Sequence, residues 1–276
     1  MLEDIVTPTG PYRLRLMNRA GTWRGALVDG SAATAWQRPD GAVVVRATTE
    51  AGLESARFML ALADDTTAFH RRFRDDHLLG PASRMLVGYR PLRVATVAHA
   101  GLRAICGQLI EARRAVAIER SILRQLGVSV ATTESLRTLS PLDLRRHGLA
   151  ASRAATLSRV VRSLDLERLR SHATDVVLQR LARERGIGAW SVGVIALEGL
   201  GRYDHGLVGD LGLVKLLASI RGEWVAAEET ATLLAPYEEW QGLAGQMLML
   251  GWSRGLIPGA DADVGRRARL RTRRVA

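Results

Sequence analysis

Hydrophobic positions in the first eighty residues change from a period of two to the period of a helix. Apolar and arginine side chains alternate over residues 12–16, and a short β-branched run over 42–45 follows the turn sequence at 39–41. Such patterns predict strands. Over residues 51–62 the apolar side chains instead fall at helical spacing, and a polar helix is expected after Asp64-Asp65. This region is therefore expected to form a small antiparallel sheet with helices.

The remainder of the chain is patterned as helices. Residues 94–126 are rich in alanine and helical in period throughout. Ser140-Pro141 has the sequence of a helix start, and Gly148 is the matching stop. Thr174 could cap a helix over 175–184. Further helices are expected over 151–164, 211–220, 226–234 and 237–250. The sequence thus predicts a mostly helical α+β protein with a small N-terminal antiparallel sheet.

Three units are expected along the chain. Residues 1–85 would form the α+β sheet domain, and residues 86–262 the helical domains that contain the candidate site. Residues 263–276 would form a disordered arginine-rich tail, because six arginines fall among its residues 266–274. Such a tail is either a solubilising extension or an arm that binds DNA.

Charge and hydropathy narrow the class of partner. The chain has 276 residues, and its 39 Lys and Arg against 28 Asp and Glu leave a net charge of +11. This surplus favours a polyanion, either nucleic acid or an anionic membrane surface. No run reaches the roughly 18 apolar residues that span a bilayer, and acids stand at residues 3–4, where a signal peptide would be basic. We therefore expect a cytoplasmic protein with no membrane-spanning segment.

Two rare residues exclude further classes of protein. Cys106 is the only cysteine, which excludes an intramolecular disulfide, a Cys-based zinc site and a four-Cys iron–sulfur cluster. The six histidines show no metal-ligand spacing, so no metal site is predicted from them. Lys215 is the only lysine, so chemistry that needs a lysine Schiff base has a single candidate.

The most informative stretch is a glycine corner between two predicted helices. Gly186-Ile187-Gly188 ends one helix, and the next begins at once with Ala189-Trp190. The triplet alone favours an ordinary turn, but amides at the start of the second helix also suit a phosphate oxygen. Asp210 follows Trp190 by one helix and one loop and precedes another helical run. It would cap that helix, worth about 1 kcal/mol, and its carboxylate could also stabilise positive charge on a substrate.

Three segments together resemble one family. The glycine corner, Trp190 and Asp210 have the order and spacing found in the helix-hairpin-helix DNA glycosylases, most closely the alkylpurine branch (3-methyladenine DNA glycosylase II type). Residues 102–110, LRAICGQLI, are similar to a second family segment, and residues 236–240, PYEEW, to a third. The resemblance covers roughly residues 95–255. It implies a helical glycosylase fold, and the alkylpurine branch also carries an N-terminal sheet.

The resemblance assigns chemistry to Asp210 and base flipping to two neighbours in the 102–110 segment. Asp210 would stabilise the oxocarbenium-like sugar that forms when an N-glycosidic bond is hydrolysed. Leu109 would be the wedge that fills the space left by the extruded base, with Gln108 beside it. A leucine is, from its type alone, more often a core residue.

The resemblance also implies contacts with the DNA backbone and the flipped base. The backbone amides of Gly186, Gly188 and Ser191 would hold a DNA phosphate, and Trp190 would line the base pocket unless it serves only core packing. No cofactor is required, although hairpin carbonyls of the family often ligate a monovalent cation. The carbonyls concerned here are those of Glu184 and Ile187.

The departures from the family pattern bear on the reaction and on the base removed. Bifunctional members carry a lysine in the second hairpin helix, but residues 189–196 contain none. A monofunctional hydrolase without AP-lyase activity is therefore expected, acting on alkylated purines in base excision repair. Arg185 stands where the family usually has proline. Aromatic residues are missing at several pocket positions, and candidates to replace them are Tyr203, Tyr237 and Trp240.

Two alternatives stay open from the sequence. The same fold could serve as a non-catalytic protein that binds damaged DNA, because the pocket is poor in aromatic residues. A membrane-surface or RNA-binding protein driven by the arginine-rich tail is the other alternative. The expected partner is double-stranded DNA with a damaged base, bound by a monomer associated with the nucleoid.

Overall fold

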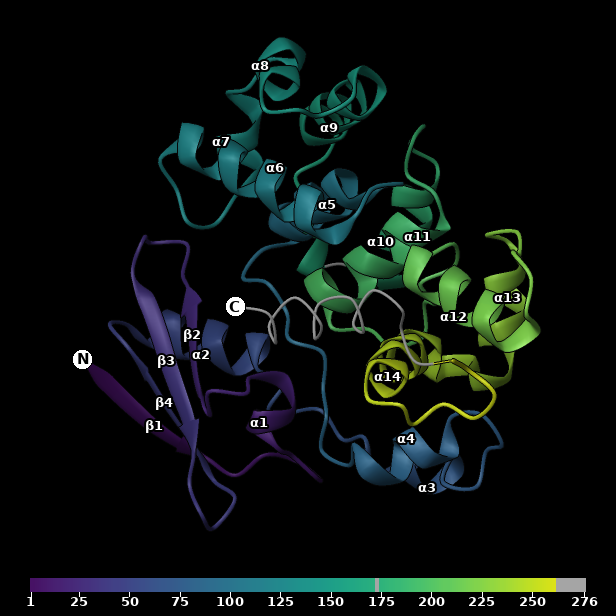
Figure 1. The fold of residues 1–276 in the computed structure, drawn as a ribbon. Helices are drawn as coiled ribbons and strands as arrows, with labels where there is room; N and C mark the ends of the chain where they lie inside the picture. The colour runs from purple at the N-terminus through teal and green to yellow at the C-terminus, as the bar shows by residue number, and fades with distance from the viewer. Residues whose placement is uncertain (172–173, 262–276) are drawn as a thin grey trace, which may run out of the picture.

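The computed structural model describes residues 1–171 and 174–261. A small antiparallel sheet lies at one side of the molecule, and helices make up the rest (Figure 1). This arrangement confirms the predicted fold class, a mostly helical α+β protein with an N-terminal sheet. The predicted arginine-rich tail, 263–276, lies outside the described residues, and the predicted domain boundaries stay predictions.

The sheet has four strands in the order β1-β4-β3-β2, and each adjacent pair is antiparallel. Side chains on β2 alternate, so that Trp23 is buried and Arg24 is exposed. Helix α2 (Glu50–Met59) covers the buried face, and Thr49 caps it by accepting a hydrogen bond from the Gly52 amide. The strands are β1 (Leu2–Val6), β2 (Thr22–Ala26), β3 (Ala32–Gln37) and β4 (Val43–Ala47).

The predicted strand at residues 12–16 is wrong. These residues lead into a single helical turn, α1 (Leu14–Met17), in which Leu14 is fully buried. Their backbone donors find partners outside any strand ladder. The Leu14 amide donates to the side-chain oxygen of Gln37, and the Arg13 amide donates to the carbonyl of Gly88. A five-residue alternation is too short to distinguish a strand from one turn of helix.

Helices account for most of the chain after residue 60. Those before the glycine corner are α3 (Thr67–Arg72), α4 (Gly80–Met85), α5 (Val97–Gly107), α6 (Ala112–Leu126), α7 (Thr133–Arg137), α8 (Pro141–Arg146), α9 (Ala151–Ser163), the 3-10 turn η1 (Glu167–Ser171) and α10 (Thr174–Ala182). Those after it are α11 (Ala189–Val194), the π-helix η2 (Ile195–Leu200), α12 (Leu211–Arg221), α13 (Glu229–Leu234), the 3-10 turn η3 (Ala235–Trp240) and α14 (Gln241–Ser253).

Local capping signals placed several helix ends correctly. Ser140 starts α8 with a capping box, in which its hydroxyl accepts from the Asp143 amide and the Asp143 side chain accepts from the Ser140 amide. Gly148 follows α8 with a φ of +93°, a left-handed conformation that glycine adopts without strain. The predicted cap Thr174 is the first residue of α10, but its side chain lies outside the described residues.

The continuous helical pattern predicted over 94–126 is interrupted. Helix α5 begins after the Thr96 cap and ends at Gly107, and α6 begins at Ala112. The four residues between them are not helical, because Leu109 has a φ of +53° and Glu111 is extended. The sequence pattern runs through this break without a signal.

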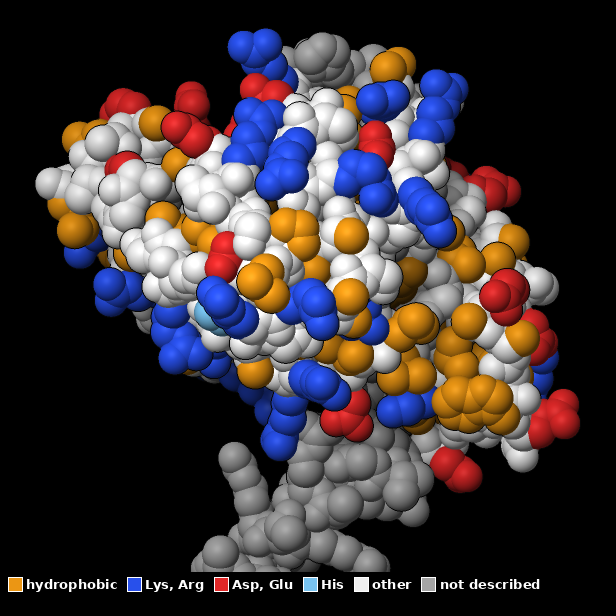
Figure 2. Space-filling view, turned by 90° about the horizontal axis from the view of Figure 1, so that it is seen from above, with side chains coloured by type: hydrophobic (Ala, Val, Ile, Leu, Met, Phe, Trp, Pro, Cys, Tyr) orange, Lys and Arg blue, Asp and Glu red, His pale blue; other side chains and the backbone are white. Residues whose placement is uncertain are grey.

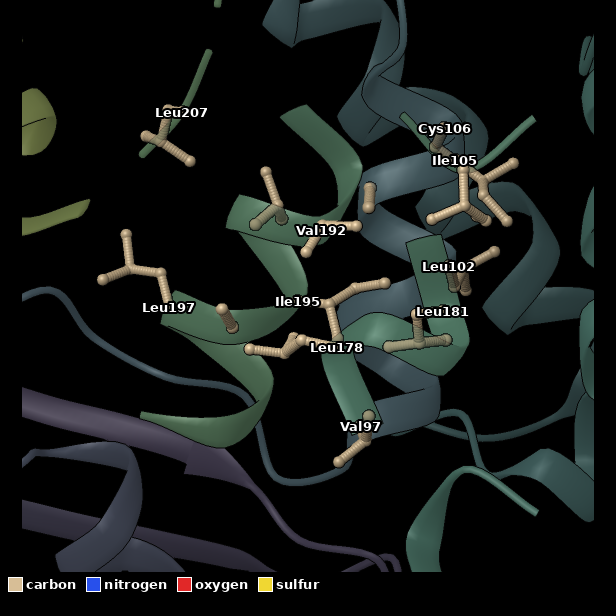
Figure 3. Close-up of a cluster of buried hydrophobic side chains, with 14 of the residues drawn as sticks. Val97, Leu102, Ile105, Cys106, Leu178, Leu181, Val192, Ile195, Leu197 and Leu207 are labelled. Atoms are coloured by element: carbon tan, nitrogen blue, oxygen red, sulfur yellow. The ribbon is translucent and has the colours of Figure 1, made fainter. Parts of the chain in front are cut away.

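Two large hydrophobic cores organise the molecule, beside a small cluster of Val214, Leu217 and Val225. One lies between the sheet and α2, and the other fills the helical part, where α5 packs against α6, α9, α11 and η2. Figure 3 shows that α5, α10, α11 and η2 contribute to a single buried cluster. Its labelled members include Val97, Leu102, Ile105, Leu178, Leu181, Val192 and Ile195. Within residues 1–171 and 174–261, no helix has the length and hydrophobicity needed to cross a bilayer.

Candidate active site

Asp210 is held by two hydrogen bonds, one to each carboxylate oxygen. It is the N-cap of α12, where Oδ1 accepts from the Gly212 amide at 2.7 Å. Oδ2 accepts from the indole Nε1 of Trp190 at 2.8 Å. The residue is partly exposed. Because a carboxylate has about four acceptor positions, two donors fix its orientation and leave capacity for water or a substrate.

The Trp190 ring connects Asp210 to the end of α5. It lies against Gly107, so that a Cβ on that glycine would come within 2.7 Å of the ring. A larger side chain at residue 107 would therefore displace the indole and its hydrogen bond to Asp210. Through this one ring, the positions of α5, α11 and α12 are coupled. The predicted pocket aromatic thus contacts the predicted catalytic carboxylate directly.

The glycine corner joins α10 to α11 as predicted. Gly186 has a φ of +88°, and a Cβ there would collide with the Thr156 hydroxyl, so only glycine fits. Ile187 is buried and fixes the corner to the helical core. Gly188 is exposed, and nothing lies within 4 Å of the position that its Cβ would take. The backbone at Gly188 is therefore open to the approach of another molecule.

Gln108 binds this corner from the other side. Its Nε2 donates to the carbonyl of Gly186 at 2.8 Å and to the hydroxyl of Ser191 at 2.9 Å. Ser191 is only 2% exposed and accepts this hydrogen bond through its hydroxyl, and the predicted contact of its backbone amide with a phosphate stays a prediction. The structure therefore brings Gln108, Gly186 and Ser191 together in one hydrogen-bonded corner.

Leu109 is the most unusual residue at the site. Its side chain is 94% exposed, and its φ of +53° lies in the left-handed region that a leucine rarely adopts. This conformation costs about 1–2 kcal/mol, and exposure of an isobutyl group adds no compensating burial. Strain of this kind clusters at functional sites. The core role that is commonest for leucine is excluded here, because the side chain points away from any core.

A buried ionic network supports the two helices that flank Leu109. Glu119 of α6 accepts from His99 Nε2 at 3.0 Å and from Arg103 Nη2 at 3.1 Å, and both donors belong to α5. Arg103 also bonds Glu198 of η2 at 2.8 Å. Burial alone would raise the pKa of Glu119, but hydrogen bonds from His99 and Arg103 and their charges outweigh it and lower the pKa to about 2. Sequence spacing gave no signal for this network.

The aromatic residues considered as replacements for pocket aromatics form a separate cluster. Tyr203 stacks on Trp240 with 5.9 Å between the ring centroids, and the Trp240 centroid lies 5.7 Å from that of Phe69. Tyr237 packs on Phe73 at 5.2 Å and is buried. These rings therefore join α3 to η3.

Met249 lies near Asp210, and the sequence gave no indication of this. Its sulfur lies 2.8 Å from the position that a Cβ on Gly212 would take.

Ligands for a metal ion could come from the carbonyls of the glycine corner or from acidic side chains. The Glu184 carbonyl accepts from the Ile187 amide at 2.9 Å, which leaves its second lone pair for a cation. The predicted monovalent cation stays a prediction. Among the described residues, no three His, Cys, Asp or Glu side chains are grouped so that they could hold a metal ion.

Basic side chains are numerous on the face of the molecule drawn in Figure 2. Seen from above the helical end of the molecule, arginine and lysine side chains spread over the middle of the face, and acidic side chains lie mostly along its margins (Figure 2). Exposed arginines on the hairpin include Arg183 and Arg185. Arg185 has the position at which the family usually has proline, and its carbonyl accepts from the Arg159 guanidinium. The excess of arginine favours contact with phosphate groups.

No known family profile and no curated protein matches the sequence. Solved structures match the fold over almost the whole chain. A 3-methyladenine DNA glycosylase from Archaeoglobus fulgidus superposes with a TM-score of 0.73 at 20% identity, covering 92% of this chain and 99% of that one. An 8-oxoguanine glycosylase/lyase from Clostridium acetobutylicum, solved with double-stranded DNA, superposes with a TM-score of 0.68 at 15% identity. The match covers 92% of this chain and 98% of that one.

A third solved structure matches a smaller share of the chain. The 3-methyladenine DNA glycosylase of Schizosaccharomyces pombe, solved with abasic DNA, gives a TM-score of 0.58 at 17% identity and covers 71% of this chain and all of that one. Two of these three proteins are thus named as 3-methyladenine DNA glycosylases, and the third as an 8-oxoguanine glycosylase/lyase. The chain therefore has the fold of the helix-hairpin-helix DNA glycosylases.

Proposed function

We propose that the protein is a DNA glycosylase that hydrolyses the N-glycosidic bond of a damaged base in duplex DNA. The observation that carries the proposal is the hydrogen-bonded pair of Trp190 and Asp210, at which a partly exposed carboxylate has a fixed orientation. This pair lies beside the glycine corner and is joined through Gly107 to the strained, exposed Leu109. A fold shared with DNA glycosylases adds support.

The proposed reaction begins with extrusion of the damaged base. Leu109 fills the space in the duplex, and the backbone at Gly186 and Gly188 contacts a phosphate of the bent strand. Extrusion costs a few kcal/mol and is easiest for a weakly paired, damaged base. The Leu109 side chain is already 94% exposed, so it loses no contacts with a protein core when it enters DNA.

Asp210 then acts on the sugar. As the bond between base and sugar breaks, positive charge develops on the sugar ring, and a carboxylate in fixed orientation stabilises that charge. The base leaves with the electron pair of the broken bond, and a water molecule adds to the sugar and gives up one proton to the solvent. Asp210 retains acceptor positions beyond those used by Gly212 and Trp190, so it can also orient this water.

We propose further that the enzyme is monofunctional and acts on alkylated purines. The second hairpin helix contains no lysine, and Lys215 is an exposed residue of α12. A Schiff base with the sugar would need a lysine amine beside Asp210. The side chain that contacts the Asp210 carboxylate is the indole of Trp190, which cannot form a Schiff base. Trp190 supplies the π surface that binds a cationic base. We expect the enzyme to act as a monomer on the DNA of the cytoplasm.

The test is a base-release assay on methylated duplex DNA. We expect free 3-methyladenine or another alkylated purine in solution, with an abasic strand that stays intact until alkali is added. Borohydride should trap no covalent complex with the DNA. A trapped complex, or strand cleavage without alkali, would contradict the monofunctional mechanism.

A non-catalytic damage-binding protein is the second candidate. It is favoured by the use of Tyr203, Tyr237 and Trp240 in a separate cluster, which leaves Trp190 as the aromatic side chain in contact with Asp210. In that case the protein would bind abasic or kinked DNA tightly and would release no base from any alkylated substrate.

A further inference from the structure

A cavity of about 910 Å³ lies between the N-terminal sheet and the helical part of the chain. Strand β2 forms one wall, and α5, α6 and the segment 128–130 form the other. Neither Asp210 nor Trp190 lines it, so it is distinct from the proposed active site. Its volume falls within the range of pockets that bind small molecules.

Arginines from both walls line this cavity. Arg24 on β2 and Arg120 and Arg124 on α6 line it and are exposed. Among the residues that the structure describes, no carboxylate lies within ion-pair distance of these three. The other two arginines of the lining are paired, Arg93 with Asp64 and Arg103 with Glu119 and Glu198.

The three arginines line the cavity together with an apolar floor. Arg24 comes from the sheet, and Arg120 and Arg124 come from the last two turns of α6, one turn apart on the same side of the helix. Like charges at one cavity repel one another, and a bound anion relieves this repulsion. The floor is made of apolar side chains, which include Trp23, Met59, Leu92 and Val130.

We propose that this cavity binds the phosphate group of a nucleotide, with the base or sugar against the apolar floor. Guanidinium groups bind phosphate through paired N–H donors, and a partly apolar ligand matches the lining. The nucleotide is either free or part of a DNA strand. Helix α6 favours the strand as a source, because it begins directly after the loop of Leu109 and ends at the cavity.

Binding can be followed at the cavity itself with a fluorescent label. Ser129 is exposed and lines the cavity, so Ser129→Cys places a thiol at its rim. The native Cys106 is buried, and burial raises the pKa of its thiol to about 12, so an environment-sensitive maleimide dye reacts at residue 129 alone. The same dye on Ala51→Cys, an exposed site on α2 outside the lining, is the control.

The labelled full chain is titrated with deoxyadenosine monophosphate and, separately, with a short undamaged single-stranded oligonucleotide. We expect a saturable change of emission at residue 129 and none at residue 51. A response to the mononucleotide assigns the site to free nucleotides, and a response to the oligonucleotide alone assigns it to a DNA strand. No response to either ligand overturns the proposal.

Charge variants decide whether the arginines hold the ligand. The double variant Arg120→Gln, Arg124→Gln should weaken binding about tenfold, because two charge-assisted contacts are lost. The matched control, Arg71→Gln with Arg145→Gln, removes the same charge from exposed arginines outside the lining. An equal loss in both double variants, or no loss in the first, overturns the proposal. Base release from a short damaged duplex should be unchanged in both, which separates this site from Asp210.

Discussion

The indole Nε1 of Trp190 donates a hydrogen bond of 2.8 Å to Oδ2 of Asp210, across twenty residues of sequence. Trp190 belongs to the hairpin, and Asp210 is the cap of α12. The contact sets the distance between the element proposed to hold DNA and the carboxylate proposed to act on the sugar. It also gives Trp190 a positioning role in addition to any stacking on a base.

Removal of this hydrogen bond should slow catalysis without unfolding the protein. Trp190→Phe keeps an aromatic ring at this position, but it loses the donor to Asp210 and the outer edge of the indole that lies against Gly107. A hydrogen bond to a charged group contributes about 1.5–3 kcal/mol, so single-turnover base release should fall about 10- to 100-fold. Trp224→Phe, at a tryptophan that is 70% exposed, should leave the rate unchanged. Equal rates for wild type and Trp190→Phe would show that this contact has no catalytic role.

Substitution of Leu109 should separate stability from DNA binding. Leu109→Gly removes the strain of a φ of +53°. We expect the free energy of unfolding to stay the same or to rise by up to about 1 kcal/mol, and the melting temperature not to fall. The same change removes the wedge, so affinity for a duplex with an abasic site should fall about tenfold. Leu142→Ala, at an exposed leucine of α8, is the control for loss of surface hydrophobicity. Undiminished affinity of the glycine variant would refute the wedge assignment.

Gln108 and Ser191 should be energetically coupled. Gln108→Ala leaves the Gly186 carbonyl and the Ser191 hydroxyl without their side-chain donor, and should destabilise the folded protein by about 1–2 kcal/mol. In a double-mutant cycle with Ser191→Ala, we expect a coupling energy of about 0.5–1.5 kcal/mol from chemical denaturation. Additive effects would mean that the two side chains act independently of each other.

The network around Glu119 should make stability depend on acid pH. Its folded pKa of about 2 lies below the ordinary value of 4.5, so its stabilising effect is complete above pH 4.5 and is lost as the pH falls towards 2. The difference corresponds to about 3 kcal/mol of unfolding free energy. Glu119→Gln should flatten this part of the pH profile, whereas Glu54→Gln, at an exposed glutamate of α2, should not. Parallel profiles for wild type and Glu119→Gln would contradict this prediction.

Local sequence signals predicted much of the fold because their causes are local. The Ser140 capping box, the start of α12 at Asp210 and the strand that became β4 depend on residues within one turn or one strand. The order of the hairpin motif and Asp210 predicted which elements meet. Their hydrogen bond could not be predicted, because it depends on how α11 and α12 pack.

The parts that the sequence did not predict depend on distant partners. The break between α5 and α6 coincides with the turn of Gln108 towards Gly186, which lies 78 residues further along the chain. The helical pattern of residues 94–126 carries no trace of that contact. Likewise, residues 12–16 form a turn whose donors bond Gln37 and Gly88, and the network at Glu119 joins three helices.

The central claim is that the charge of Asp210 drives base release, and Asp210→Asn tests it most directly. Asparagine also caps helices, so α12 should keep its start while the negative charge is lost. On an alkylated duplex under single-turnover conditions, we predict release at least about 100-fold slower than wild type, with DNA binding retained and with Asp75→Asn, at an exposed aspartate, unaffected. Release by Asp210→Asn at the wild-type rate would contradict the account.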